Sequence, residues 1–262
     1  MIFQIFSFGL IGILAGLLSG LLGIGGGIVT IPCLLLVFSK LDIPSSAAMH
    51  LAIGTSLAAM VFNTLSGSYA HYKKKAVLFH VLKPMALGII IGAILGATIA
   101  NFLSSHFLKI FFGCFEILIG IRFLMPNPKE IKEKTLPSFW PLSAISLCVT
   151  TLSTLLGIGG GLLNVPILSH FGTPVKKAIG TSSALSFLIS LCGAISFLVF
   201  GMQATKAPDT LGYIYIPAFL MISFVAFFAA PFGAHLAHRL PTKVLKKTFA
   251  LILIGAGLTM IL

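Results

Sequence analysis

Apolar residues run through this chain in long stretches that are separated by short polar segments. The stretches cover residues 3–38, 47–70, 77–101, 107–125, 138–171, 178–201, 212–236 and 244–262. Several of them reach the roughly 20 residues that an α-helix needs to cross a bilayer. The pattern therefore predicts an all-α polytopic membrane protein.

Composition supports this class and narrows the partners. The chain is 58% hydrophobic and 8% charged, with a mean hydropathy of +1.11, whereas charged residues make up about 25% of a soluble domain. The basic residues that give the net charge of +12 lie in short loops between apolar stretches. In such loops the distribution of Lys and Arg indicates the orientation in the membrane. We therefore predict the lipid bilayer, and no nucleic acid, as a partner.

Two halves of the sequence resemble each other. LSGLLGIGGGIVTIP at 18–32 returns as LSTLLGIGGGLLNVP at 152–166 with ten of fifteen positions identical, and AIGTS at 52–56 returns at 178–182. A third match aligns Gly96 with Gly233 and Gly120 with Gly257. The domains predicted from these matches are a first membrane repeat at 1–125, a solvated cytoplasmic linker at 126–137 and a second membrane repeat at 138–262.

Chain length and charge favour an inverted relation between the repeats. The first apolar stretch of each half would extend about 50 Å as one helix, beyond a core of about 30 Å. We therefore predict that each half begins with a helical hairpin broken at its glycines and continues with three spanning helices. With five passes per half, the second copy is inverted relative to the first. Fourteen basic residues then lie on one side of the membrane, and only Lys40, Lys109 and Lys206 lie on the other. Eight simple crossings would instead divide the basic residues eight to nine.

This uneven distribution obeys the positive-inside rule. It predicts that both termini lie on the non-cytoplasmic side of the membrane. Whether the short second arms, roughly 27–39 and 161–171, cross fully or re-enter stays open from the sequence.

Each glycine run has the pattern of a helix N-terminus preceded by bare backbone. Unpaired N–H groups there point at a ligand without obstruction by side chains, and the helix dipole favours an anion. In hydrocarbon, such irregular backbone survives only where protein or a water-filled cavity receives its polar groups. An inverted repeat can aim two such ends at one point in the membrane. The alternative is that the glycines allow close helix packing.

Polar side chains near these runs can add hydrogen-bond donors. They lie in the short second arms and in the two AIGTS elements, and Asn63 lies two turns further along. The alternative for the hydroxyls is a hydrogen bond to a carbonyl of their own helix. The predicted substrate-binding residues are Gly25, Gly26, Gly27, Thr30, Thr55, Ser56, Asn63, Gly159, Gly160, Gly161, Asn164, Thr181 and Ser182.

Three ionisable residues are candidates for the pathway or for coupling. His50 aligns with Lys176 when the AIGTS elements are superposed, and Glu116 lies well inside an apolar stretch, where ionised residues are costly and often functional. The alternatives are interfacial anchors for His50 and Lys176, and for Glu116 a structural pair with Lys109 or a protonated helix contact.

The sequence predicts no catalytic residues, no metal site and no cofactor. GxSxG, HExxH and GK[ST] elements are missing from it, and the five acidic residues form no intramembrane cluster. We therefore expect a protein that is not an enzyme.

The paired GxGGG-x4-P elements, both AIGTS copies and SGSYAHYKKKAV at 66–77 resemble the TauE/SafE sulfite exporter family of bacterial inner-membrane proteins. The resemblance covers essentially the whole chain. It implies a secondary transporter that exports sulfite or a related small sulfur oxyanion or organosulfonate by alternating access. Asn164 stands where the first motif has Thr30, which leaves the half-sites chemically unequal.

Alternatives remain at this point. They are an uptake carrier for a different small anion or organosulfur compound, an anion channel, and a membrane-embedded enzyme. The sequence also leaves open the anion, the direction of transport, coupling to protons or sodium, and the oligomeric state, for which a homodimer is one arrangement.

Overall fold

The computed structural model describes residues 2–41, 43–125, 136–204, 208–237, 239 and 242–261. All of the predicted linker except its last two residues lies outside these ranges, as does Lys206.

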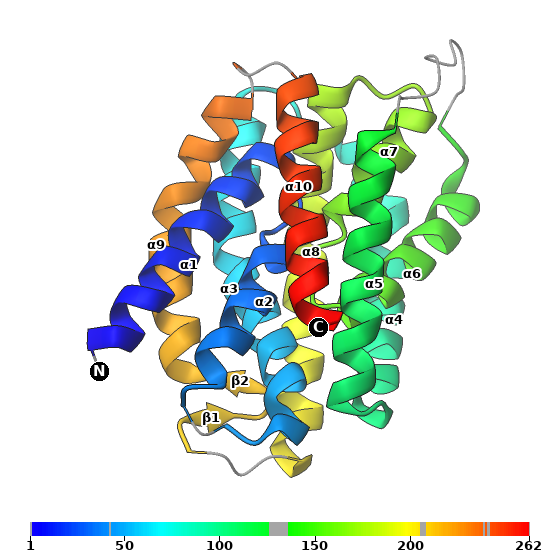
Figure 1. Cartoon of the computed structure of the whole chain (residues 1–262). Helices are drawn as coiled ribbons and strands as arrows, with labels where there is room; N and C mark the ends of the chain where they lie inside the picture. Colours follow the sequence, from blue (N-terminus) through cyan, green and yellow to red (C-terminus); the bar gives the residue numbers. More distant parts are fainter. Residues whose placement is uncertain are drawn as a thin grey trace.

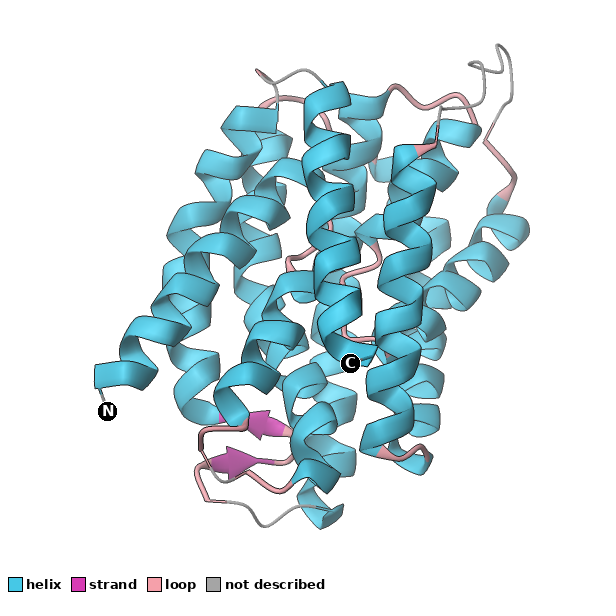
Figure 2. Ribbon diagram, in the orientation of Figure 1, coloured by secondary structure: helices cyan, strands magenta, loops and turns pink. Residues whose placement is uncertain are grey.

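Helices account for almost all of the described chain, as the apolar stretches predict. Within the described ranges there are ten helices and one short hairpin of strands (Figure 2). The helices are α1 (Ile2–Leu22), α2 (Gly27–Phe38), α3 (Ser45–Lys73), α4 (Phe79–Phe102), α5 (Ser105–Leu124), α6 (Phe139–Leu155), α7 (Gly161–His170), α8 (Val175–Ala204), α9 (Ile216–Ala237) and α10 (Thr242–Ile261), and the strands are β1 (Thr210–Leu211) and β2 (Ile214–Tyr215).

The first apolar stretch of each half breaks at its glycines. In the first half α1 ends at Leu22 and α2 begins at Gly27, and in the second half α6 ends at Leu155 and α7 begins at Gly161. With 12 and 10 residues, α2 and α7 measure about 18 and 15 Å. Because a bilayer core is about 30 Å thick, these arms are half-helices that do not cross by themselves.

Spanning helices surround the broken ones. Among the described residues, five helices are long and apolar enough to cross a membrane by length and composition, namely α1 from Phe3, α3, α4, α8 and α9. Large apolar side chains point outward, with Phe102 84%, Phe6 73% and Phe232 71% exposed. Polar side chains such as Ser56 and Ser182 are instead fully buried. This inside-out distribution is that of a multi-pass membrane protein.

Helices of the first half pair with helices of the second. α1 packs along α9, α4 along α6, α3 against α8 and α5 against α10. Glycines permit the close α4–α6 contact, because a methyl group on Gly92 would lie 2.6 Å from the carbonyl oxygen of Leu147, and one on Gly96 would crowd that of Thr151. If α1 corresponds to α6 and α4 to α9, then each helix packs against the counterpart of the other one. The bounds of the repeats stay a prediction.

The start of α1 and the end of α10 both lie toward the lower end of the bundle in Figure 1. By contrast, α5 ends near the top of the view. The prediction of an odd number of passes in each half is consistent with this arrangement, and the number of passes stays a prediction. Which side of the membrane the termini face stays a prediction.

Candidate functional site

The two glycine breaks meet backbone to backbone, within the loops that Figure 2 draws between helices. A methyl group on Gly25 would lie 3.3 Å from the Cα atom of Gly159, and one on Gly27 would overlap the carbonyl oxygen of Gly157. Every residue other than glycine carries a Cβ atom, so glycine alone permits these contacts. The structure therefore brings together the predicted site glycines of both halves.

Each half-helix begins with an uncapped glycine. Gly26 precedes α2 with φ of 81° and Gly160 precedes α7 with φ of 71°, and neither cap makes a side-chain hydrogen bond. In each helix the first backbone N–H to reach the cap carbonyl comes three residues later. The amide N–H groups of Gly27 and Gly161 therefore precede the helical hydrogen-bond ladder, which is the geometry of an anion site.

The carbonyl side of each break is capped by side chains. Ser56 Oγ donates to the carbonyl oxygen of Gly157 at 3.2 Å. Ser186 Oγ and Ser182 Oγ donate to that of Gly23 at 3.1 and 3.4 Å. Serines of each half thus satisfy a carbonyl in the break of the other half.

These contacts change the balance of partial charge at the two glycine breaks. The C-terminal ends of α1 and α6 carry negative partial charge and the N-terminal ends of α2 and α7 carry positive partial charge. Hydroxyl donors offset the carbonyl ends, while the cap residues of α2 and α7, Gly26 and Gly160, have no side chain with which to cap the N–H ends.

Asn63 joins the first break as the sequence predicts. Its side-chain Nδ2 donates to the carbonyl oxygen of Gly25 at 3.1 Å, and its Oδ1 accepts from Ser19 Oγ at 3.4 Å. Asn63 is fully buried. It therefore anchors the backbone of the first break.

The threonines of the AIGTS elements contact other segments. Thr55 Oγ1 accepts from the backbone N–H of Tyr215 at 2.9 Å, and Thr181 Oγ1 accepts from that of Leu78 at 3.0 Å. These N–H groups come just before α9 and α4. The two threonines thus hold equivalent segments, whereas the neighbouring serines hold the glycine breaks.

Thr30 and Asn164 occupy equivalent positions but differ in their contacts. Thr30 Oγ1 donates to the carbonyl oxygen of Gly26, 3.0 Å away in its own half-helix. Asn164 is 1% exposed, and in the described structure neither its Nδ2 nor its Oδ1 has a hydrogen-bond partner.

His50 and Lys176 lie in different environments. His50 is buried, with its Nε2 2.9 Å from the carbonyl oxygen of Ala100 and its ring stacked 5.1 Å from that of Tyr213. Tyr213 Oη donates to Asn101 Oδ1, and burial raises the pKa of this tyrosine. Lys176 is exposed at the start of α8. A shared role at the mouth of the pathway stays a prediction.

Glu116 lies on α5, which packs against α10. It is 1% exposed, and within the described residues neither carboxyl oxygen has a hydrogen-bond partner. A role in coupling stays a prediction.

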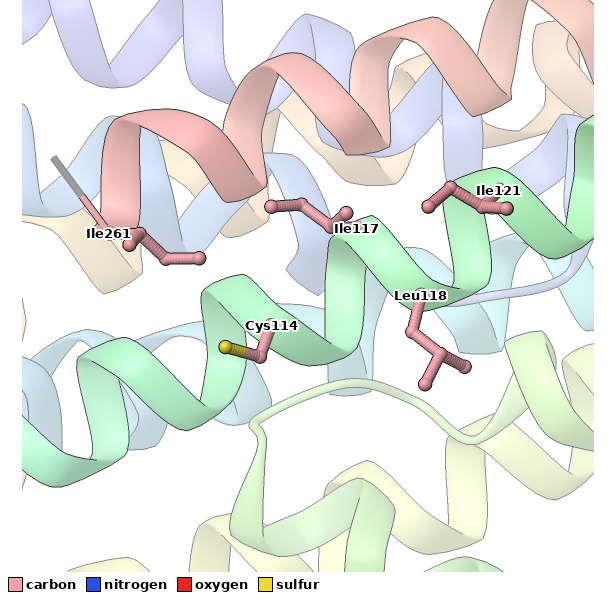
Figure 3. A pocket seen from close by; sticks show the side chains of 5 residues that line it. All are labelled: Cys114, Ile117, Leu118, Ile121 and Ile261. Carbon is pink, nitrogen blue, oxygen red and sulfur yellow. The ribbon is translucent and has the colours of Figure 1, made fainter.

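Two pockets lie apart from the glycine breaks. One of about 330 Å³ opens between α5 and α10 and is lined by apolar groups and one thiol (Figure 3). The other, of about 730 Å³, lies at the starts of α4 and α6 and includes His80 and Lys83. Neither pocket is lined by a predicted site residue.

Sequence reasoning missed Ser153 and Ser186. Ser153 is fully buried in the described structure and its hydroxyl has no partner. Ser186 stands one turn after Ser182 and donates to the same carbonyl. The four-residue spacing, which places two side chains on one helix face, is the signal that could have identified Ser186.

Comparison with known proteins agrees with this architecture. The profile of the family described as Sulfite exporter TauE/SafE matches residues 8–260. A probable membrane transporter protein of Haemophilus influenzae is 34% identical over 97% of this chain and 96% of its own. A probable membrane transporter protein of Methanocaldococcus jannaschii is 28% identical over 97% of this chain and 94% of its own. No solved structure matches. Family and relatives support a membrane transporter.

Proposed function

We propose that this chain, which belongs to the sulfite exporter TauE/SafE family, exports sulfite or a related small sulfur oxyanion or organosulfonate across the inner membrane. The observation that carries the proposal is the unequal capping of the glycine breaks. Hydroxyls occupy their carbonyl ends, while α2 and α7 each begin after a glycine that has no side chain to cap their N–H ends. Such N–H groups bind oxyanions.

Transport proceeds by alternating access around these breaks. Residues 23–30 and 157–162 are all buried, as an occluded centre between inward-open and outward-open states requires. Half-helices that begin at glycines can turn about them, because glycine tolerates large changes in φ and ψ. An inside-negative potential favours anion exit by about 2.3 kcal/mol per charge per 100 mV, which supplies a driving force without ATP.

The proposal is tested with the full chain in sulfite-loaded proteoliposomes held at fixed potentials. We expect saturable sulfite efflux that accelerates as the inside becomes more negative. Absence of saturable oxyanion flux overturns the proposal. Flux that stays linear with concentration at channel rates indicates a pore, and net uptake in cells indicates an importer.

Two glycine variants provide a matched comparison. Gly160→Ala places a methyl group where φ is positive and beside Ser153 and Asn164, whereas a methyl group on Gly255 of α10 meets nothing within 4 Å. We expect Gly160→Ala to lose flux and Gly255→Ala to retain it. Equal flux in both variants contradicts a site at the breaks.

A further inference from the structure

The polar groups of the first break are already used within the protein. Ser19 donates to Asn63, Asn63 donates to Gly25 and Thr30 donates to Gly26. These bonds leave none of the three side chains without a partner. These polar side chains of the first break are therefore satisfied within the protein.

The second break lacks this network. The motif registers pair Ser19 with Ser153, Thr30 with Asn164 and Asn63 with Ile189. Ile189 cannot donate a hydrogen bond. Ser153 and Asn164 are 0% and 1% exposed, and in the described structure their side-chain polar atoms have no partner.

These two side chains lie close together at the start of α7, packed with Ile189, whose Cδ1 would lie 2.5 Å from a methyl group on Gly160. A methyl group on Gly160 would lie 3.2 Å from Asn164 Nδ2 and 3.4 Å from Ser153 Oγ. Asn164 stands one turn into α7, and helical side chains lean toward the N-terminus of their helix. Its amide therefore lies at the same end as the N–H group of Gly161.

Resting on the proposed function, we infer that the oxyanion binds asymmetrically, on the second break. Ser153 Oγ and Asn164 Nδ2 donate to its oxygens together with the first N–H groups of α7. The first break, whose polar side chains are bonded within the protein, contributes no side chain to the oxyanion. Burying three unpartnered polar atoms is unfavourable, and a bound oxyanion satisfies two of them.

The variant Asn164→Thr distinguishes a role of Asn164 in binding the oxyanion from a purely structural role. Thr30 shows that threonine at this place satisfies itself on the cap carbonyl, so the variant should melt no lower than the wild type. A purely structural role predicts unchanged transport. Binding predicts a sulfite KM raised about tenfold, the effect of losing one hydrogen bond to a charged group.

Ser153→Ala is the second variant, and Ser19→Ala is its matched control from the first half. We expect Ser153→Ala to raise KM in the same direction as Asn164→Thr. Ser19→Ala should lower the melting temperature and leave KM within about twofold, because it breaks a bond within the protein.

Sulfite flux in proteoliposomes and thermal melting of the same preparations supply both readouts. Wild-type KM in Asn164→Thr and Ser153→Ala, or an equal rise in Ser19→Ala, overturns the asymmetric site while the proposed function stands. If the wild type itself carries no oxyanion, the proposed function and this inference both fall. If Asn164→Thr does not fold, the sulfite KM values of Ser153→Ala and Ser19→Ala are compared instead, and a rise in Ser153→Ala alone supports the asymmetric site.

Discussion

Ser56 donates its hydroxyl proton to the carbonyl oxygen of Gly157, 3.2 Å away in the other half of the chain. Ser186 returns the contact by donating to Gly23 at 3.1 Å. These bonds tie each glycine break to the long helix of the opposite half. They also offset the negative ends of α1 and α6 beside the positive ends of α2 and α7.

Removal of either hydroxyl should weaken both the fold and anion transport. We expect Ser56→Ala and Ser186→Ala each to lose about 1 kcal/mol of unfolding free energy and to slow sulfite flux, because a carbonyl that loses a donor repels the anion more strongly. Ser56→Ala removes the donor to Gly157, whereas Ser186→Ala leaves Gly23 with the longer bond from Ser182. Exposed Ser39, which donates to Leu36 in a local bond, is the control. Thermal melts and flux assays check this, and Ser56→Ala behaving like Ser39→Ala contradicts it.

The close approach of α4 and α6 should depend on glycine. Gly92→Ala places a methyl group 2.6 Å from the carbonyl oxygen of Leu147, so the helices must separate, at a cost of about 1–3 kcal/mol. Gly255→Ala meets nothing within 4 Å and should gain up to about 1 kcal/mol from helix propensity. Melting temperatures in detergent test the pair. A Gly92→Ala variant as stable as Gly255→Ala would show that the contact is not tight.

The threonines of the AIGTS elements should stabilise the starts of α4 and α9. Thr181→Val leaves the N–H of Leu78 without its acceptor, and Thr55→Val does the same to Tyr215. Each loss should cost about 1–3 kcal/mol and speed amide exchange at that residue. Hydrogen–deuterium exchange by mass spectrometry measures this. Unchanged protection at both sites would exclude the proposed support.

The inverted arrangement predicts which loops face the cytoplasm. Lys73 and Lys40 are both exposed, at the ends of α3 and α2. In a background without Cys33, Cys114, Cys148 and Cys192, we expect a membrane-impermeant maleimide added to intact cells to label Lys40→Cys and spare Lys73→Cys. Both sites should react after the cells are opened. Labelling of both sites from outside would rule out the inversion.

The fold class and the positions of the helix breaks were predictable from local sequence patterns. The apolar stretches predicted an all-α membrane protein, and the glycine clusters predicted where α1 and α6 end, because a helix longer than the bilayer must break where its backbone is least constrained. The paired motifs indicated the TauE/SafE family, which the comparison confirms.

The contacts that polar side chains make with distant segments were decided only by tertiary packing. Thr55 and Ser56 are neighbours, yet successive residues on a helix point about 100° apart, so one contacts Tyr215 and the other contacts Gly157. Asn164 and Thr30 share a place in the motif, but Asn63 bonds to the first break, whereas Ile189 stands at the corresponding position of the second half. A hydrogen bond depends on which atoms the packed helices bring within about 3 Å, and that distance is set across the bundle rather than along the chain.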